Sequence, residues 1–160
     1  YIRLAKGYDP IVTNDATPFE IGRAVPMREG GDALLLTTGI TLGIALEAAG
    51  VLADQGVEAS VLHCHTVKPL DIASILEHAG PVPVVVTVAE QSRIGGLGSA
   101  VAEVVAEANF DPAQRFKRIG LPDLFPDEYG SQACLMEKYS VTPQNVVSEV
   151  RALAGLNYAS

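Results

Sequence analysis

The sequence has only two cysteines and few basic residues, and each shortage argues against a class of protein. Cys64 and Cys134 stand in unrelated surroundings, without the C-x-x-C spacing of a zinc site or the cysteine density of a disulfide scaffold. Acidic residues outnumber basic ones by 19 to 11, and the net charge of -8 argues against a nucleic-acid partner, which requires a basic surface. A reducing, cytoplasmic compartment is the simplest expectation.

The sequence also lacks a long apolar run. No segment approaches the ~18 residues of a membrane-spanning helix, and no signal peptide opens the chain. The 160 residues, 48% of them apolar, suffice for one domain with its own core. Because the first residue is Tyr1 and not methionine, we expect a piece of a longer protein. Residues 1–20 contain two prolines and no sustained period, so we interpret them as an interdomain linker before a domain at 21–160.

Five segments have the composition of strands. Residues 33–37 and 82–88 are apolar almost throughout, which is typical of strands buried on both faces of a parallel sheet. Residues 58–66 form another candidate strand. Pro26 in residues 21–28 and the charges in residues 115–119 predict that these two outer segments are the sheet edges.

Helical periodicity fills the intervals between these strands. We expect helices after Thr41, over residues 72–79, over residues 101–108, near residues 134–139 and between Thr142 and Gly155, with Thr41, Asp71 and Thr142 as N-caps. The order predicts a three-layer α/β/α sandwich whose helix-linked strands are parallel. The pattern alone leaves the partner of the first strand open.

A glycine-rich loop follows the strand at residues 82–88. Gly95, Gly96 and Gly98 precede a helix, so free backbone N–H groups there could face an anion. The spacing is neither a G-x-G-x-x-G fingerprint nor a phosphate-binding P-loop, and a nucleotide site is weakly indicated. Turn geometry with close packing is one interpretation, and contact with a ligand or partner is the other.

Glu90 is the strongest titratable candidate because it stands at the end of a buried strand. The alternative is a carboxylate that accepts backbone N–H bonds from residues 91–98. Ligands of open α/β sheets bind beyond the carboxyl ends of neighbouring strands. If the second and fourth strands are adjacent, a crevice for a small anion or a partner side chain would lie between their loops. Its candidate residues are Thr38, Gly39, Thr41, Glu90, Gln91, Gly95, Gly96 and Gly98.

His63, Cys64 and His65 resemble metal ligands in the linear sequence. Strand geometry turns Cys64 to the face opposite the two histidines, so the three cannot share one ion, and no metal site is expected. Ser92 and Ser99 lack a nucleophile-elbow motif. We therefore assign no catalytic residue from these patterns, and a hydrolase with Glu90 as general base is only a distant alternative.

Five motifs in order resemble the C-terminal domain of the transketolase family. They are TTG (37–39), HTVKPLD (65–71), TVAEQSRIGGLGSAVAEV (87–104), KRIGLPDLF (117–125) and LMEKYSVTPQNVV (135–147). The strongest similarity is to the C-terminal part of a split, two-subunit transketolase. The same domain occurs in 1-deoxyxylulose-5-phosphate synthase and in the beta subunit of 2-oxo-acid dehydrogenases.

This resemblance implies a mixed five-stranded sheet of order 1-3-2-4-5 with the first strand antiparallel. It also implies an enzyme that uses thiamine diphosphate and magnesium, held by preceding pyrimidine- and pyrophosphate-binding domains or a partner subunit. The C-terminal domain would then support a homodimer or heterotetramer and carry no catalytic, cofactor-binding or metal-binding residue. Gln91 stands where the family often has histidine, and Tyr129 where it often has serine, which leaves the subgroup open. A stand-alone module that binds an anion or nucleotide in the crevice is the alternative.

Overall fold

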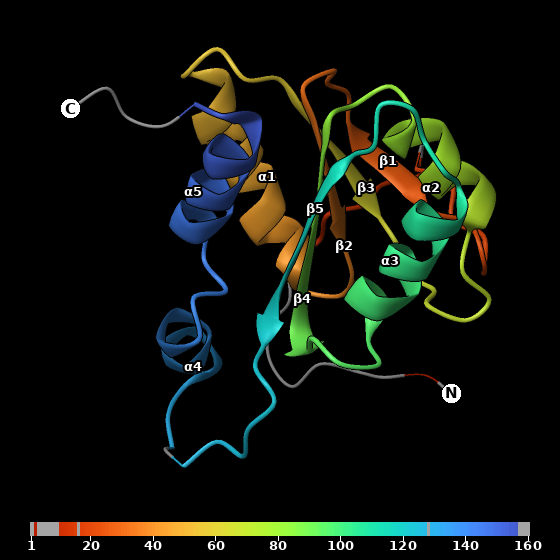
Figure 1. The fold of residues 1–160 in the computed structure, drawn as a ribbon. Helices are drawn as coiled ribbons and strands as arrows, with labels where there is room; N and C mark the ends of the chain where they lie inside the picture. Colours follow the sequence, from red (N-terminus) through yellow and green to blue (C-terminus); the bar gives the residue numbers. More distant parts are fainter. Residues whose placement is uncertain (1, 3–9, 16, 128, 157–160) are drawn as a thin grey trace.

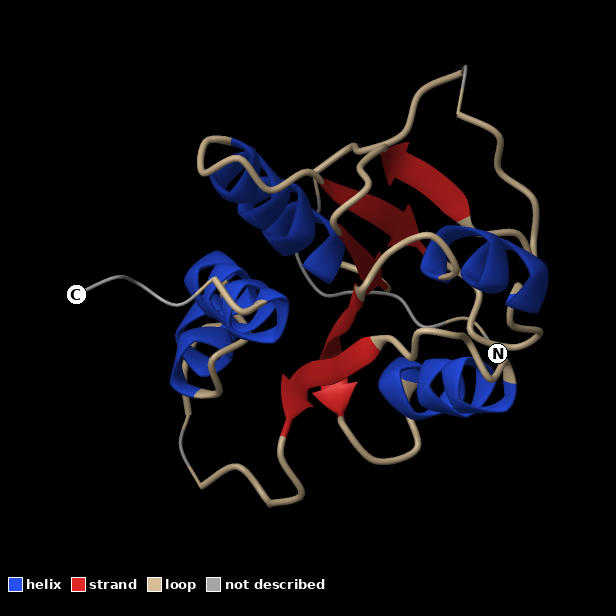
Figure 2. Ribbon diagram, turned by 45° about the horizontal axis from the view of Figure 1, so that its top comes forward, coloured by secondary structure: helices blue, strands red, loops and turns tan. Residues whose placement is uncertain are grey.

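The computed structural model describes residues 2, 10–15, 17–127 and 129–156, which form a five-stranded mixed sheet between two layers of helices (Figures 1 and 2). The strand order is β1-β3-β2-β4-β5, with β1 antiparallel to β3 and the other neighbours parallel. The strands are β1 (Val25–Arg28), β2 (Ala33–Thr37), β3 (Ala59–His63), β4 (Val84–Ser92) and β5 (Arg115–Leu121). The predicted three-layer sandwich, its strand order and its two edges are confirmed.

Alternating side chains of the central strands pack into two separate hydrophobic cores, one on each face of the sheet. Leu35 of β2 and Val86 of β4 point to one face, whereas Leu34 and Val85, one residue earlier, point to the other. All five residues of β2 are buried. The continuous apolar runs of the sequence therefore correspond to strands covered on both faces, as expected for parallel pairs.

The helices divide between the two faces of the sheet. Helices α1 (Thr41–Ala53) and α5 (Pro143–Ala154) cover one face, and α2 (Ile72–Ala79) and α3 (Leu97–Glu107) cover the other, as Figure 1 shows. Helix α4 (Gln132–Lys138) has no fully buried residue and lies at the periphery of the domain (Figure 1), where Met136 packs against the core on the α1 and α5 side. Within the described part of the chain, no helix is long and apolar enough to cross a lipid bilayer.

Two predicted N-caps are confirmed and one is wrong. Asp71 accepts a hydrogen bond from the N–H of Ser74, and Thr142 accepts one from the N–H of Asn145. Gly155 ends α5 in the left-handed conformation. Thr41 is not a cap, because Ile40 occupies that position without a side-chain bond and Thr41 is the first helical residue.

Several predicted strand bounds shift. The first strand begins at Val25 and not at residue 21, because the chain turns at Gly22, whose φ is 89°. The third strand ends at His63. Strands β4 and β5 run on to Ser92 and Leu121 because they continue to pair, and the N–H of Arg93 donates to the Leu121 carbonyl over 2.9 Å.

Candidate functional site

The predicted crevice lies where the carboxyl ends of β2 and β4 meet. The two strands are parallel neighbours, with Thr37 paired to Val88, so the loops that follow them are adjacent. The hydroxyl of Thr41 lies 2.7 Å from the carbonyl oxygen of Val88 and 2.9 Å from that of Thr38. Thr41 is fully buried and Thr38 nearly so. The Thr41 hydroxyl thus connects the loop after β2 to β4, and Thr38 contributes its backbone carbonyl to this contact.

The remaining residues of the first loop provide its turn. Gly39 is exposed and has a φ of 58°, in the left-handed region that side chains rarely adopt. The N–H of Leu42 returns to the Gly39 carbonyl at 3.4 Å, which tightens the entry to α1. A conformational requirement therefore explains Gly39.

Glu90 is partly buried near the end of β4. Its Oε2 accepts a hydrogen bond of 2.6 Å from Nε2 of Gln132, which belongs to α4. Sequence reasoning missed Gln132, because 42 residues separate the two and no local pattern links them. The neighbouring Gln91 is also partly buried, with Oε1 beside Gly96.

The three glycines of the loop have different structural reasons. Gly95 has a φ of 74°. A Cβ on Gly96 would lie 2.9 Å from the Ser92 carbonyl oxygen, and one on Gly98 would lie 2.8 Å from Oγ1 of Thr87. The Cβ of Gly98 would also lie 3.0 Å from the Arg118 side chain, so that side chain crosses α3 where no Cβ stands. These geometries support the packing interpretation of the loop.

Ser99 closes the loop on itself. Its hydroxyl donates to the Arg93 carbonyl over 3.1 Å, and it accepts bonds from the N–H of Gly95 and from Nη1 of Arg118. Arg118 also donates to the Arg93 carbonyl over 2.8 Å. Arg118 is a second residue that the sequence did not single out. The only signal for Arg118 in the sequence is that it belongs to a charged edge strand, two residues before Gly120.

The histidines occupy a different part of the carboxyl edge. Nδ1 of His63 lies 2.9 Å from Oγ1 of Thr37, and the ring of His65 stacks on Phe19 with centroids 4.1 Å apart. Burial, and then the neighbouring His65, lowers the pKa of His63 to about 4. Burial also lowers the pKa of His65. The lowered pKa keeps the His63 ring neutral at pH 7, where it bonds to Thr37, and the His65 ring packs on Phe19.

Cys64 packs on the α2 and α3 side of the sheet, away from these rings, as predicted. Burial raises the pKa of its thiol to about 12, so it is not a reactive thiolate. Among the residues that the structure describes, no group of three histidine, cysteine or acidic side chains is arranged to hold a metal ion.

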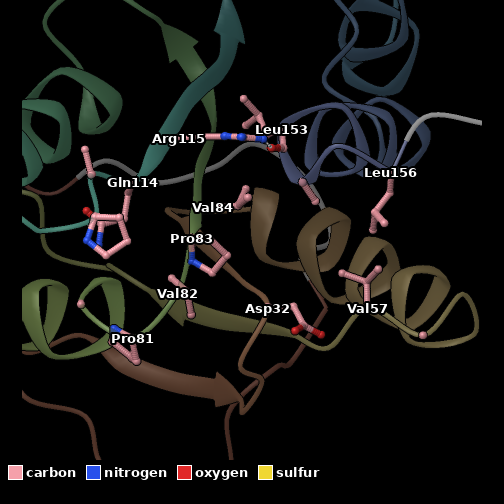
Figure 3. Close-up of a pocket in the computed structure, with 15 residues that line it drawn as sticks. Asp32, Val57, Pro81, Val82, Pro83, Val84, Gln114, Arg115, Leu153 and Leu156 are labelled. Carbon is pink, nitrogen blue, oxygen red and sulfur yellow. Dashed lines mark hydrogen bonds between the residues drawn. The ribbon is translucent and has the colours of Figure 1, made fainter.

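Two hollows lie elsewhere on the molecule. One hollow of about 620 Å³ lies at the amino ends of β4 and β5 (Figure 3). It is bordered by Pro81–Val84 and by the end of α5, where Arg115 donates a hydrogen bond to the Leu153 carbonyl. It contains none of the predicted site residues. The other, of about 790 Å³, lies between α3 and the edge strand β5 and includes Arg93, Ser99 and Arg118.

Comparison with known proteins identifies the family. The profile described as the transketolase C-terminal domain matches residues 22–146. The chain is 42% identical, over 147 residues, to the 6-deoxy-6-sulfo-D-fructose transketolase subunit SqwH of Clostridium sp. (strain MSTE9), covering 92% of this chain and 44% of that subunit. It is 38% identical, over 154 residues, to 1-deoxy-D-xylulose-5-phosphate synthase of Symbiobacterium thermophilum, covering 95% of this chain and 23% of that enzyme.

A solved structure supports the same family assignment. A split-gene transketolase, described as an inactive β4 tetramer, superposes with a TM-score of 0.82 at 36% identity, over 94% of this chain and 48% of that one. The chain thus spans less than half the length of these relatives. The profile match, the sheet order and the superposition lead to the same conclusion: this chain belongs to the transketolase C-terminal domain family.

Proposed function

We propose that this chain is the C-terminal domain of a thiamine diphosphate-dependent, transketolase-type transferase of the cytoplasm. The full enzyme would transfer a two-carbon ketol unit between sugar phosphates. Thiamine diphosphate and magnesium would be held by preceding domains or a partner subunit, and this domain would support the assembly. The observation that carries the proposal is the transketolase C-terminal profile, which matches residues 22–146.

The polar groups at the carboxyl edge support a role without catalytic residues. The hydroxyl of Thr41 is held by two backbone carbonyls, and Glu90 is bonded to Gln132. Ser99 is held by the N–H of Gly95 and by Arg118. Side chains bound within the fold in this way stabilise the domain, whereas catalysis needs groups directed at a substrate.

The relatives support a partner in the complete enzyme. SqwH is described as a transketolase subunit, and the solved neighbour is a split-gene transketolase. Both chains are about twice as long as the region that this chain matches. We infer that a pyrimidine-binding domain precedes this one and that a pyrophosphate-binding domain lies in the same chain or in a partner subunit, giving a homodimer or a heterotetramer.

The subgroup decides the substrate. The relatives include a 6-deoxy-6-sulfo-D-fructose transketolase subunit and a 1-deoxy-D-xylulose-5-phosphate synthase. The synthase is therefore one alternative to transketolase. The beta subunit of a 2-oxo-acid dehydrogenase, which the motif resemblance leaves open, is the other. Gln91 and Tyr129 depart from the pattern common in the family, and both lie outside the two cores.

An assay of the full-length protein tests this proposal. With thiamine diphosphate and magnesium, and with its partner subunit if there is one, we expect two-carbon transfer from a ketose donor to an aldose phosphate. Condensation of pyruvate with an aldose phosphate would assign the synthase instead. Turnover by the 160-residue chain alone would contradict the proposal, as would a full-length protein whose activity does not depend on thiamine diphosphate.

A further inference from the structure

The chain approaches the sheet along residues 17–24, which we call the strap and which lead directly into β1. Three contacts join the strap to the residues that follow β3. They are a ring stack of Phe19 on His65, a hydrogen bond from Gly22 to Thr66 and a hydrogen bond from Ala24 to Asp71. The strap therefore follows a defined path over the carboxyl edge of the sheet.

Ala24 is the anchored end of the strap. Its N–H donates to Oδ2 of Asp71 over 2.9 Å, and the same carboxylate accepts bonds from Ser74 of α2. Burial opposes ionisation of Asp71, but these hydrogen bonds outweigh it and lower the pKa of the carboxyl group. The carboxylate thus stays ionised at neutral and mildly acidic pH, and this anchor does not respond to pH there.

A chain of two hydrogen bonds holds the middle of the strap. The N–H of Gly22 donates to Oγ1 of Thr66 over 3.1 Å, and that hydroxyl oxygen lies 2.9 Å from Nδ1 of His65. Among the described residues the hydroxyl has no other acceptor, so its hydrogen is directed at Nδ1. Nδ1 is then the acceptor, which places the proton of the neutral ring on Nε2.

The same imidazole ring holds the outer part of the strap. Phe19 stacks on His65 with ring centroids 4.1 Å apart and 22° between the ring planes. The Phe19 side chain is still 66% exposed, so water reaches the stack. Nε2 of His65 is buried, and it has no hydrogen-bond partner within the described part of the chain. One neutral ring thus supports two of the three contacts of the strap.

A second proton on His65 would disturb both of these contacts. Nδ1 would become a donor to an oxygen that already accepts the Gly22 N–H, and the Thr66 hydroxyl hydrogen would lose its acceptor. The positive charge would extend to the buried Nε2, which costs free energy. Burial lowers the pKa of His65, and the Arg23 carbonyl opposes this shift. Because cation–π attraction is small at an exposed ring, stacking on Phe19 does not offset these losses.

The surrounding charges do not compensate a positive His65. Among the described residues, no acidic side chain forms an ion pair with it. The ring of His63 lies 6.4 Å away, and its pKa of about 4 keeps it neutral where His65 titrates. The charged groups of the neighbouring segments are Glu20, Arg23, Lys68 and Asp71. Arg23 and Lys68 are cations, and the Asp71 carboxylate is engaged by Ala24 and Ser74.

We propose that His65 is a pH-sensitive latch: its neutral ring fastens residues 17–23 to the loop after β3, and its protonation releases them while Ala24 stays anchored. In the proposed full-length enzyme the strap leads to the preceding domain. The latch would then control how firmly the two domains are joined. That consequence rests on the proposed function, whereas the latch itself does not.

Amide hydrogen exchange of the isotope-labelled chain, followed by NMR between about pH 7.5 and pH 5, tests the latch. The imidazole signals of His65 report its protonation in the same samples. We expect the protection factor of the Gly22 amide to fall at least about fivefold as His65 gains its proton, with the same midpoint. The amides of Ala24 and of β4 should keep their protection, which also shows that the domain stays folded.

Variants separate the latch from a general effect of acid. His65→Phe keeps an aromatic ring beside Phe19 but cannot titrate, so the protection of Gly22 should no longer depend on pH. Thr66→Val removes the hydroxyl and should leave the Gly22 amide unprotected at every pH, whereas Thr66→Ser should retain the response. His78→Gln is the matched control, because the His78 ring bonds to a carbonyl within α2, and it should leave the response unchanged.

Three results would overturn the latch. They are a Gly22 amide that stays protected while His65 titrates, a His65 midpoint at or above that of a histidine in an unstructured peptide, and a pH response that persists in the His65→Phe chain. Unchanged protection of Gly22 in Thr66→Val would contradict the hydrogen-bond chain itself. None of these results bears on the proposed enzyme class, which the full-length activity assay tests separately.

Discussion

Thr41 bonds to Val88 across the switch point of the sheet: its hydroxyl oxygen lies 2.7 Å from the Val88 carbonyl oxygen. The same hydroxyl lies 2.9 Å from the Thr38 carbonyl. One buried side chain thus lies within hydrogen-bond distance of one carbonyl in the loop after β2 and one in strand β4. At the edge where an open α/β sheet usually binds a ligand, this hydroxyl is engaged by the protein's own carbonyl groups.

We expect Thr41→Val to destabilise the domain by about 1–3 kcal/mol, because it leaves buried carbonyl groups without their donor at nearly constant volume. Thr41→Ser keeps the hydroxyl and serves as the control, so it should lose less. Urea unfolding measures both. A Thr41→Val variant as stable as the wild type would show that the bond contributes nothing.

Gly98→Ala should destabilise the domain by about 1–3 kcal/mol through overpacking. The new Cβ would lie 2.8 Å from Oγ1 of Thr87 and 3.0 Å from the Arg118 stem. Gly50→Ala in the interior of α1 is the matched control, because a Cβ there would meet no neighbouring group within 4 Å and the substitution should gain about 0.5–1 kcal/mol. Equal effects of the two substitutions, measured by thermal unfolding, would refute the packing role of Gly98.

His63 should make stability depend on pH. Burial lowers its pKa to about 4 in the folded state, whereas the unfolded chain titrates near 6.5. The unfolded state therefore binds more protons between these values, so stability is fully present above pH 6.5 and falls as the pH drops toward 4, by up to about 3 kcal/mol. His63→Gln should flatten this part of the curve in urea titrations at several pH values. An unchanged slope would assign the effect to other groups.

Asp71 connects the residue before β1 to the start of α2, so we expect its removal to destabilise the domain more than removal of the N-cap Thr142. Its carboxylate accepts bonds from the N–H of Ala24, at 2.9 Å, and from Ser74. We expect Asp71→Ala to cost about 2–3 kcal/mol, against about 1 kcal/mol for Thr142→Ala, whose cap serves only α5. Chemical unfolding gives the free energy of unfolding of both variants. A larger decrease for Thr142→Ala than for Asp71→Ala would contradict this prediction.

The crevice should not respond to phosphate compounds. Titration of the isotope-labelled chain with inorganic phosphate and a nucleotide should leave the amide signals of residues 38–41 unshifted, because Thr38 and Thr41 are buried and internally bonded. Saturable shifts confined to residues 38–41 and 90–99 would instead favour the stand-alone binding module.

The fold could be predicted largely because its signals are local. The apolar run of β4, Pro26 in β1 and the cap at Asp71 each act within a few residues, and together they indicate the sandwich and its edges. The partner of β1 came from the family resemblance, because a four-residue edge strand carries no signal for its neighbour.

The side-chain partners at the candidate site were less predictable. Gln132 reaches Glu90 over 42 residues, and Arg118 reaches Ser99 from another strand. Thr41 was predicted as an N-cap because threonine favours the N-cap position. In the structure its hydroxyl instead donates to the carbonyl of Val88 in β4. Contacts of this kind depend on strand order and on close approach, which composition and periodicity do not encode.

We propose that this domain belongs to a thiamine diphosphate enzyme without itself holding the cofactor. Isothermal titration calorimetry of thiamine diphosphate with magnesium into the 160-residue chain tests it most directly, with the full-length protein and any partner subunit as the positive control. We expect saturable binding to the complete enzyme and no heat of binding to this chain. Tight, stoichiometric binding to the chain alone would show that this domain itself holds the cofactor.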